Sequence, residues 1–366
     1  NKGLKLETGF KLSGVKTDNN LQAQKQVGGK FVNDSTLTNR FVYDEKIDAG
    51  YVNLTRNFKN TSVQAGVRAE YTSSMGDLIT SKEVVSRHYL NFFPSVFINH
   101  TINDKNEIGL NYSRRIDRPG YDDLNPFVYY LDQYTYQKGN PFLNPQYTNN
   151  FELNYTYNHT INLSIGYSRT TDVITQILET DPVSKATFQT NLNLQTQNSY
   201  NININSPFTI NSWWSGNANV NGFYLGFKSD TLLGAKLNDG RYAYQLRLTN
   251  TFQIAKTYKF ELMGDYQSAL TYGIFNIKPQ YAIDAGISHS FANKRANIKL
   301  AMNDIFNMRR NNVTSYYQQN NLDIRQKNDS RITRLTFTYN FGSTKLKMHH
   351  HESGDDDLKG RVKGNN

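Results

Sequence analysis

The sequence predicts an all-β protein, a transmembrane antiparallel up-and-down β-barrel with about 14 strands among its 366 residues. First, large apolar residues alternate with polar ones at a period of two almost everywhere, which is the pattern of strands with two different faces. Second, short polar turns alternate with longer links, as they do in membrane barrels. Third, aromatic residues make up 13% of the chain although its mean hydropathy is only −0.68.

The composition narrows the fold classes further. Disordered chains are poor in aromatic residues, whereas this chain has 25 Tyr and 21 Phe. Only 37% of the residues are hydrophobic, too few for a large water-free core. No stretch approaches 18 uninterrupted apolar residues, so we expect no transmembrane helix. The absence of Cys excludes disulfides, thiol catalysis and thiolate metal sites.

The alternating segments define the expected strands in chain order. Clear examples cover residues 4–13, 63–71, 108–115, 151–158, 258–265 and 334–341. Between residues 185 and 210 the apolar residues stay on even positions, so we expect one strand of about 25 residues, roughly 80 Å long. The segment 46–58 is ambiguous, because either Ile47, Ala49 and Tyr51 or Val52, Leu54 and Phe58 form its apolar face.

The connections fall into two kinds. Short turns are expected at 59–61, 103–105, 158–160, 209–212, 255–257 and 292–294. The alternate connections are the longer links 15–40, 74–88, 118–146, 229–238 and 309–328, together with brief ones at 181–184 and 271–275. This alternation indicates a barrel whose last strand ends on the short-turn side.

The two faces of each strand are expected to meet different solvents. A membrane admits only helices and closed barrels, because unpaired backbone groups are too costly in hydrocarbon. Residues expected to face lipid are Leu153, Tyr155, Ile202, Ile204, Phe260, Leu335, Phe337, Tyr339 and Phe341, and residues expected to face the lumen or a plug are Arg68, Glu70, Arg115, Glu152 and Asn154. Trp213, Trp214, Tyr242, Tyr244, Tyr258 and Tyr281 suit interfacial girdles. The alternative is a large soluble β-sandwich or solenoid.

Several motifs resemble one protein family. The segment "YSRRIDRPGYDDLNPFVYYLDQYTYQKGNPFLNPQYTNNFELNYTY", residues 112–157, resembles the mid-barrel signature of TonB-dependent receptors. More closely, it resembles the outer-membrane β-barrel family common in Bacteroidetes-type bacteria. Gln146 stands where that family usually has Glu. "MNDIFN" at 302–307 and "RLTFTYNFG" at 334–342 are similar to the family's last two strands.

The resemblance implies a bacterial outer-membrane barrel of about 22 strands, plugged by an N-terminal globular domain. It also implies energy from TonB through a box at the extreme N-terminus. Residues 1–342 would then form the C-terminal part of the barrel, short of roughly eight strands and of the plug. Residues 343–366 would form a charged, disordered periplasmic tail. The implied partners are lipid and lipopolysaccharide, the plug, TonB and a possible surface lipoprotein.

The link 118–146 is the candidate ligand-binding segment. It carries the carboxylates Asp122 and Asp123 and the rings Phe127, Tyr129, Tyr130, Tyr134 and Tyr136. Rings and carboxylates on an outward loop could hold a sugar, a peptide or a chelate. Alternatively, the loop packs these rings over the barrel mouth. Arg115 is expected to face the lumen, where it could pair with a plug carboxylate.

Other functions are not supported by the pattern. The net charge of +10 is spread singly, without the stripe of a nucleic-acid binder, and fits phosphate-rich lipid head groups better. The histidines at 349–351 lie in the tail, and the others are isolated, so we expect no metal, no cofactor and no catalysis. The expected function is nutrient uptake by a TonB-dependent transporter (siderophore, glycan or peptide). The alternative is a non-energised barrel that serves as a structural or interaction subunit.

Overall fold

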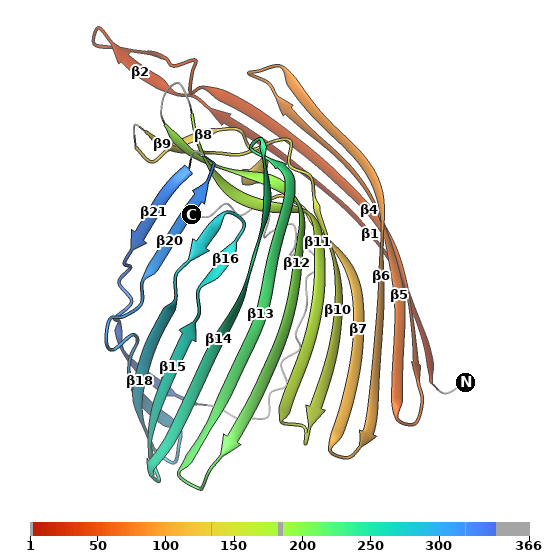
Figure 1. Ribbon diagram of the computed structural model, residues 1–366, viewed down its shortest axis with the longest axis vertical. Coiled ribbons are helices and arrows are strands. Elements are labelled where there is room, and N and C mark those ends of the chain that lie inside the picture. Colours follow the sequence, from red (N-terminus) through yellow and green to blue (C-terminus); the bar gives the residue numbers. More distant parts are fainter. Residues whose placement is uncertain (1–2, 133, 182–185, 319, 342–366) are drawn as a thin grey trace.

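The computed structural model describes residues 3–341 except 133, 182–185 and 319, and it forms one long antiparallel sheet curved into part of a barrel (Figure 1). Fourteen strands follow one another along this sheet in chain order, which confirms the predicted fold class and strand number. They are β1 (Leu4–Leu21), β4 (Asn39–Asn57), β5 (Thr61–Leu78), β6 (Glu83–Asn103), β7 (Asn106–Asp117), β10 (Gln146–Tyr157), β11 (Ile161–Thr180), β12 (Thr187–Thr209), β13 (Trp214–Leu232), β14 (Ala235–Ala255), β15 (Tyr258–Gln267), β18 (Gln280–Phe291), β19 (Ala296–Met302) and β22 (Thr333–Tyr339).

The remaining elements lie in the connections that alternate with the short turns. They are the hairpin β2 (Gln24–Val27) and β3 (Lys30–Asn33), the helix α1 (Tyr121–Leu124), β8 (Val128–Tyr130), β9 (Thr135–Lys138), β16 (Leu270–Tyr272), β17 (Phe275–Ile277), β20 (Asn311–Tyr317) and β21 (Asn320–Gln326). Strands β16, β17, β20 and β21 form a second sheet. Among the described residues, none of the helices has the length and apolar character needed to cross a membrane.

All six predicted short turns separate consecutive strands in the structure. The longer links differ from the prediction, because the strands continue into them. Strands β5 and β6 meet across residues 79–82, and β13 and β14 meet across Leu233 and Gly234. Hydrogen bonds between neighbouring strands satisfy the backbone N–H and C=O groups in water as well as in lipid. Strands with polar ends can therefore extend beyond the segments in which apolar and polar residues alternate.

The register gives the sheet two continuous faces. Leu153 pairs with Leu110 and with Ile165, and Ile165 pairs with Ile202, so one face carries large apolar side chains from strand to strand. We call it the apolar face. Glu152 lies opposite Asn111 and Gly166 on the other face, which we call the polar face.

Strand β4 resolves the ambiguity of segment 46–58. Leu54 pairs with Leu6 and Val52 pairs with Val67, so these side chains lie on the apolar face. Ile47 and Ala49 are buried on the polar face. Both faces of this strand therefore carry apolar residues, which explains why its sequence pattern was undecided.

Two belts of rings follow the apolar face. In the first, the centroids of neighbouring rings lie 4.7–6.3 Å apart along Tyr112, Phe151, Tyr167, Tyr200, Tyr224 and Tyr242. The second includes Trp213, Trp214, Phe252 and Phe260. Tyr242 and Phe252 lie ten residues apart on β14, which corresponds to about 25 Å across a membrane for a strand tilted by about 40°.

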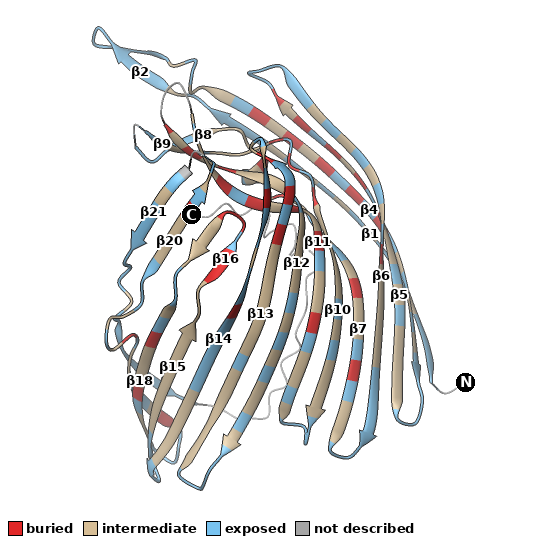
Figure 2. Cartoon of the chain, viewed as in Figure 1, coloured by how far each residue is buried: buried red, intermediate tan, exposed pale blue. Residues whose placement is uncertain are grey.

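Strand β12 is 23 residues long and matches the predicted 185–210, but its two halves differ. Its pairing with β11 is interrupted at Asp172, whose φ of 55° is left-handed. Beyond that point residues 173–180 of β11 and 187–194 of β12 form an upper ribbon. There Val173, Ile177 and Leu194 are fully buried against Phe227, Leu232, Leu237 and Ile274. Figure 2 marks such buried positions in red. The apolar residues of the upper ribbon therefore pack against other connections of the same protein.

Candidate functional site

The 118–146 loop is fastened to the polar face by a buried ion pair. One Nη of Arg118 lies 2.7 Å from Glu70 Oε2 and also donates to Thr72 Oγ1 at 2.9 Å. The side chains of Arg118 and Glu70 are only 7% and 9% exposed. Arg68 Nε donates to the other carboxylate oxygen of Glu70 at 2.5 Å. Arg68 and Glu70, the two predicted lumen residues of β5, thus both take part, and Arg118 joins them from the loop.

A small apolar core supports the start of the loop. Tyr121 and Leu124 of α1, together with Leu143, pack against Phe41 and Tyr43 of β4. These side chains are all buried. None of these loop residues is among the predicted rings, so this core leaves open the alternative in which the loop packs those rings over the barrel mouth.

The Gly139-Asn140-Pro141 motif closes the loop on itself. Gly139 N donates to the carbonyl oxygen of Asn125 at 3.0 Å, and a Cβ at Gly139 would lie 2.2 Å from that oxygen. Asn140 N donates to the carbonyl of Asp123 at 2.6 Å, and its Nδ2 donates to the carbonyl of Asn191 at 3.0 Å. The motif needs Gly because two backbone segments approach too closely for any side chain.

Two further contacts join the loop to the upper ribbon. Asn191 Nδ2 donates to Asp123 Oδ1 at 2.8 Å, while the other oxygen of Asp123 accepts from Gly120 N at 3.0 Å. Gln146 donates to Asp117 Oδ2 at 3.2 Å and accepts from Ile174 N at 2.9 Å. A carboxylate at residue 146 could only accept, so Gln is the residue that satisfies both neighbours.

Between the loop and the ribbon lies a cavity of about 530 Å³, which we call the loop cavity. It is lined by Asp122, Asp123, Asn125, Phe127, Tyr129, Gln137, Lys138, Gly139, Gln189, Thr190 and Asn191. Four of the seven predicted ligand residues therefore meet in one place. The residues from β12 were missed, because nothing in the sequence indicates that this strand returns to the 118–146 loop.

The other predicted rings lie outside the loop cavity. Tyr130 contacts Tyr136 at 5.5 Å between ring centroids, and Tyr136 stacks on Phe188 at 5.2 Å. Burial raises the pKa of the Tyr136 phenol, as do the nearby carboxylates of Asp181 and Glu179. Lys138 Nζ lies 4.1 Å from the centre of the Phe188 ring. Tyr134 is exposed.

The strand register places the remaining residues that were predicted to face lipid or the lumen. Glu152 accepts from Asn154 Nδ2 at 2.7 Å on the polar face. Arg115 lies on the same face opposite Thr148 and is exposed. Leu153, Tyr155, Ile202, Ile204, Phe260, Leu335, Phe337 and Tyr339 share the apolar face. Phe341 follows the end of β22 and is exposed.

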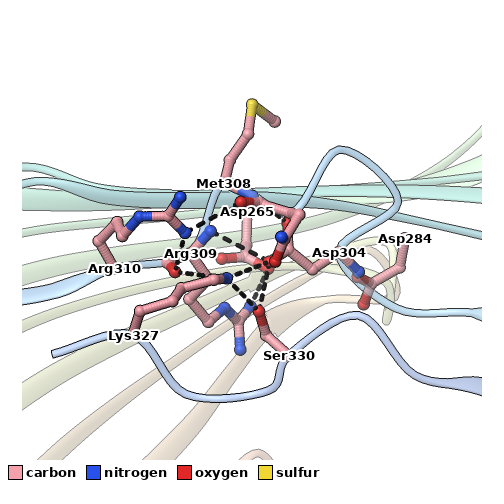
Figure 3. A network of polar contacts seen from close by, with 9 residues as sticks. Asp265, Asp284, Asp304, Met308, Arg309, Arg310, Lys327 and Ser330 are labelled. Carbon is pink, nitrogen blue, oxygen red and sulfur yellow. Dashed lines mark hydrogen bonds and ion pairs between the residues drawn. The ribbon is translucent and has the colours of Figure 1, made fainter.

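The "MNDIFN" segment contains a polar hub that the sequence did not reveal (Figure 3). Asp304 is 1% exposed and accepts from Ser330 Oγ at 2.5 Å and from Met308 N at 2.7 Å. It also accepts from Arg309 N at 3.1 Å, and Lys327 Nζ lies 3.7 Å away. Burial opposes ionisation, but these donors and the ammonium lower the pKa of Asp304 to about 2. Asp304, Met308 and Arg309 lie at the start of the connection between β19 and β22, and Lys327 and Ser330 lie at its end. The hub therefore joins the two ends of the connection that contains β20 and β21.

The described residues contain no group of three or more potential metal ligands. The histidines at 349–351 and the predicted tail 343–366 lie outside the described residues.

Comparisons with known proteins agree with this architecture. The outer membrane protein beta-barrel family matches residues 1–339. No curated protein matches the chain. The ferric yersiniabactin uptake receptor FyuA from Yersinia pestis is 15% identical, with a TM-score of 0.60, over 92% of this chain and 51% of its own. The ferric-catecholate import receptor Fiu from E. coli K12 is 12% identical, with a TM-score of 0.59, over 93% and 52%.

The copper transporter OprC is 9% identical, with a TM-score of 0.64, over 93% of this chain and 55% of its own. The chain thus spans about half the length of these structures. All three are named as receptors or transporters and none as an enzyme. The resemblance to the Bacteroidetes type stays a prediction. The match over residues 1–339 shows that the chain belongs to the outer membrane protein beta-barrel family.

Proposed function

We propose that this chain is the C-terminal part of a TonB-dependent outer-membrane receptor that takes up a nutrient. The observation that carries the proposal is the continuous sheet with an apolar face and a polar face, in a chain that belongs to an outer-membrane barrel family. Similar folds are found in receptors named for uptake or import. In this function the sheet is a passive wall, and the elements in its longer connections capture the ligand.

The apolar face contacts lipid in this proposal. Its two ring belts lie at the two interfaces, where amphipathic aromatic side chains are enriched. The longer connections then lie outside the cell, and the C-terminal end of β22 lies on the periplasmic side. Residues 1–342 form part of the wall, and the tail 343–366 is periplasmic.

The polar face is proposed to contact a plug domain supplied by the remainder of the protein. Arg115 is exposed there and forms no ion pair with any residue that the structure describes. A plug carboxylate would satisfy this guanidinium. TonB would reach the plug from the periplasm, and a surface lipoprotein could cover the long connections.

The first test is the intact mass and N-terminal sequence of the protein extracted from outer membranes. A mass of roughly twice 42.1 kDa with a plug-like segment before Asn1 is expected. Uptake of the protein's nutrient should then stop when TonB is deleted. A 42.1 kDa protein without a plug would instead support a non-energised barrel that acts as a structural or interaction subunit.

A further inference from the structure

The loop cavity has a charge that disfavours anions. Its lining contains the carboxylates of Asp122 and Asp123 and a single ammonium, that of Lys138. The ammonium is held against the ring of Phe188, at 4.1 Å from its centre. An anionic ligand would therefore meet two carboxylates and only one cation, already engaged with a ring. Such a site is poorly suited to an anionic metal chelate.

The polar groups of the cavity both donate and accept hydrogen bonds. Both carboxylate oxygens of Asp123 accept hydrogen bonds, one from Asn191 and one from Gly120. Asp122 is exposed, and its carboxylate accepts no hydrogen bond from the described residues. Gln137 and Gln189 add amide groups, each with two donor hydrogens and an acceptor oxygen. Hydroxyl groups also donate and accept hydrogen bonds. The amide side chains of the cavity and the carboxylate of Asp122 can therefore bind a ligand with many hydroxyl groups.

An exposed ring completes the cavity. Tyr129 is 68% exposed, and Phe127 lines the same space. The flat face of a tyrosine can stack on the apolar C–H face of a sugar ring while its hydroxyl stays in water. The volume of about 530 Å³ falls in the range of about 300–1,000 Å³ that is usual for small-molecule sites.

From the charge, the amides and the ring together, we infer that the loop cavity binds an uncharged, hydroxyl-rich ligand of the saccharide class. The inference rests on the proposed function in one respect only, namely that this ligand is the nutrient. The cavity is formed by two segments far apart in the sequence, so binding also strengthens the contact between the 118–146 loop and the upper ribbon.

The test uses the full-length protein purified from outer membranes in detergent, with isothermal titration calorimetry. The probes are the neutral trisaccharides maltotriose, cellotriose, xylotriose and triacetylchitotriose, and the anionic chelate ferric enterobactin. We expect at least one trisaccharide to bind and the chelate not to bind. Tyr129→Ala and Asp122→Asn should each weaken saccharide binding about tenfold, through the lost ring face and the lost charged acceptor.

Tyr134→Ala is the matched control, because Tyr134 is 65% exposed on the same loop but lies outside the cavity. It should leave saccharide binding unchanged. Heat-modified migration in gels checks that every variant forms a folded barrel. The inference is overturned if none of the trisaccharides binds, if binding is the same in Tyr129→Ala and Asp122→Asn, or if ferric enterobactin binds with sensitivity to these two substitutions.

Uptake separates this inference from the proposed function. A trisaccharide that binds in the cavity but enters cells equally well without TonB would sustain the ligand assignment and contradict energised uptake. TonB-dependent uptake of an anionic chelate, without saccharide binding, would support energised uptake and contradict the ligand assignment.

Discussion

Arg118 and Glu70 form a buried ion pair of 2.7 Å that joins the 118–146 loop to strand β5 of the barrel wall. The two residues lie 48 positions apart in the chain. Arg68 also contacts the same carboxylate, so Glu70 holds two guanidinium groups. Since Arg118 is the residue at which the loop leaves β7, this contact sets the direction in which the loop crosses the polar face.

Glu70→Gln should release the 118–146 loop from the wall. Removing one partner of a buried pair leaves an uncompensated charge, which costs about 3–5 kcal/mol. We expect the loop to become sensitive to trypsin in folded, detergent-solubilised protein. Glu7→Gln is the control, since Glu7 forms only an exposed ion pair with Lys5 on β1. Equal trypsin resistance of wild type and Glu70→Gln would show that the pair does not hold the loop.

Gly139→Ala should destabilise the loop, because its new Cβ would lie 2.2 Å from the carbonyl oxygen of Asn125. Overpacking of this kind costs about 1–3 kcal/mol. The expected result is faster hydrogen exchange at the amides of Gly139 and Asn140, which donate to Asn125 and Asp123. Gly50→Ala is the control, because nothing lies within 4 Å of its added Cβ. Unchanged exchange in Gly139→Ala would contradict the close approach.

A pair of adjacent substitutions in β12 tests which face meets lipid. Ile204 lies on the apolar face and Asn203 on the polar face. Ile204→Arg should lower the free energy of unfolding of the protein in phospholipid vesicles by about 2–4 kcal/mol, whereas Asn203→Arg should change it much less. Urea titration of the folded protein in vesicles measures both. A larger loss in Asn203→Arg would mean that the faces are assigned the wrong way round.

The Asp304 hub should give the fold a distinct pH dependence. The pKa of Asp304 is about 2 in the folded protein against an ordinary value of 3.8. Its folded pKa is depressed, so its stabilising contribution is fully present above pH 3.8 and is lost as the pH falls towards 2. Thermal unfolding of wild type and Asp304→Asn, followed by circular dichroism, should differ by a constant amount from pH 7 to pH 4. The difference should shrink between pH 4 and pH 2. A difference that persists unchanged at pH 2 would show that the charge is not what matters.

The alternating pattern of the sequence was enough to predict the fold class, the strand number and the short turns. Those features depend on local chemistry, because a period of two assigns each side chain to a face and polar turn residues interrupt it. The shared face of Leu153, Ile202 and Phe337 follows from the same parity once neighbouring strands are paired. The length of β12 was likewise visible in its unbroken phase.

The contacts between connections were decided by the tertiary structure alone. The pairing of Arg118 with Glu70 depends on the direction in which the chain leaves β7, which the period of the sequence does not encode. The burial of Leu194 depends on the interruption at Asp172 and on the packing of Ile274 from a distant connection. The loop cavity requires Gln189 and Asn191 of β12 to meet Asp122 and Tyr129 of the 118–146 loop. Local pattern determines faces because it acts between neighbouring residues, whereas a site formed by separate loops exists only after the sheet has brought them together.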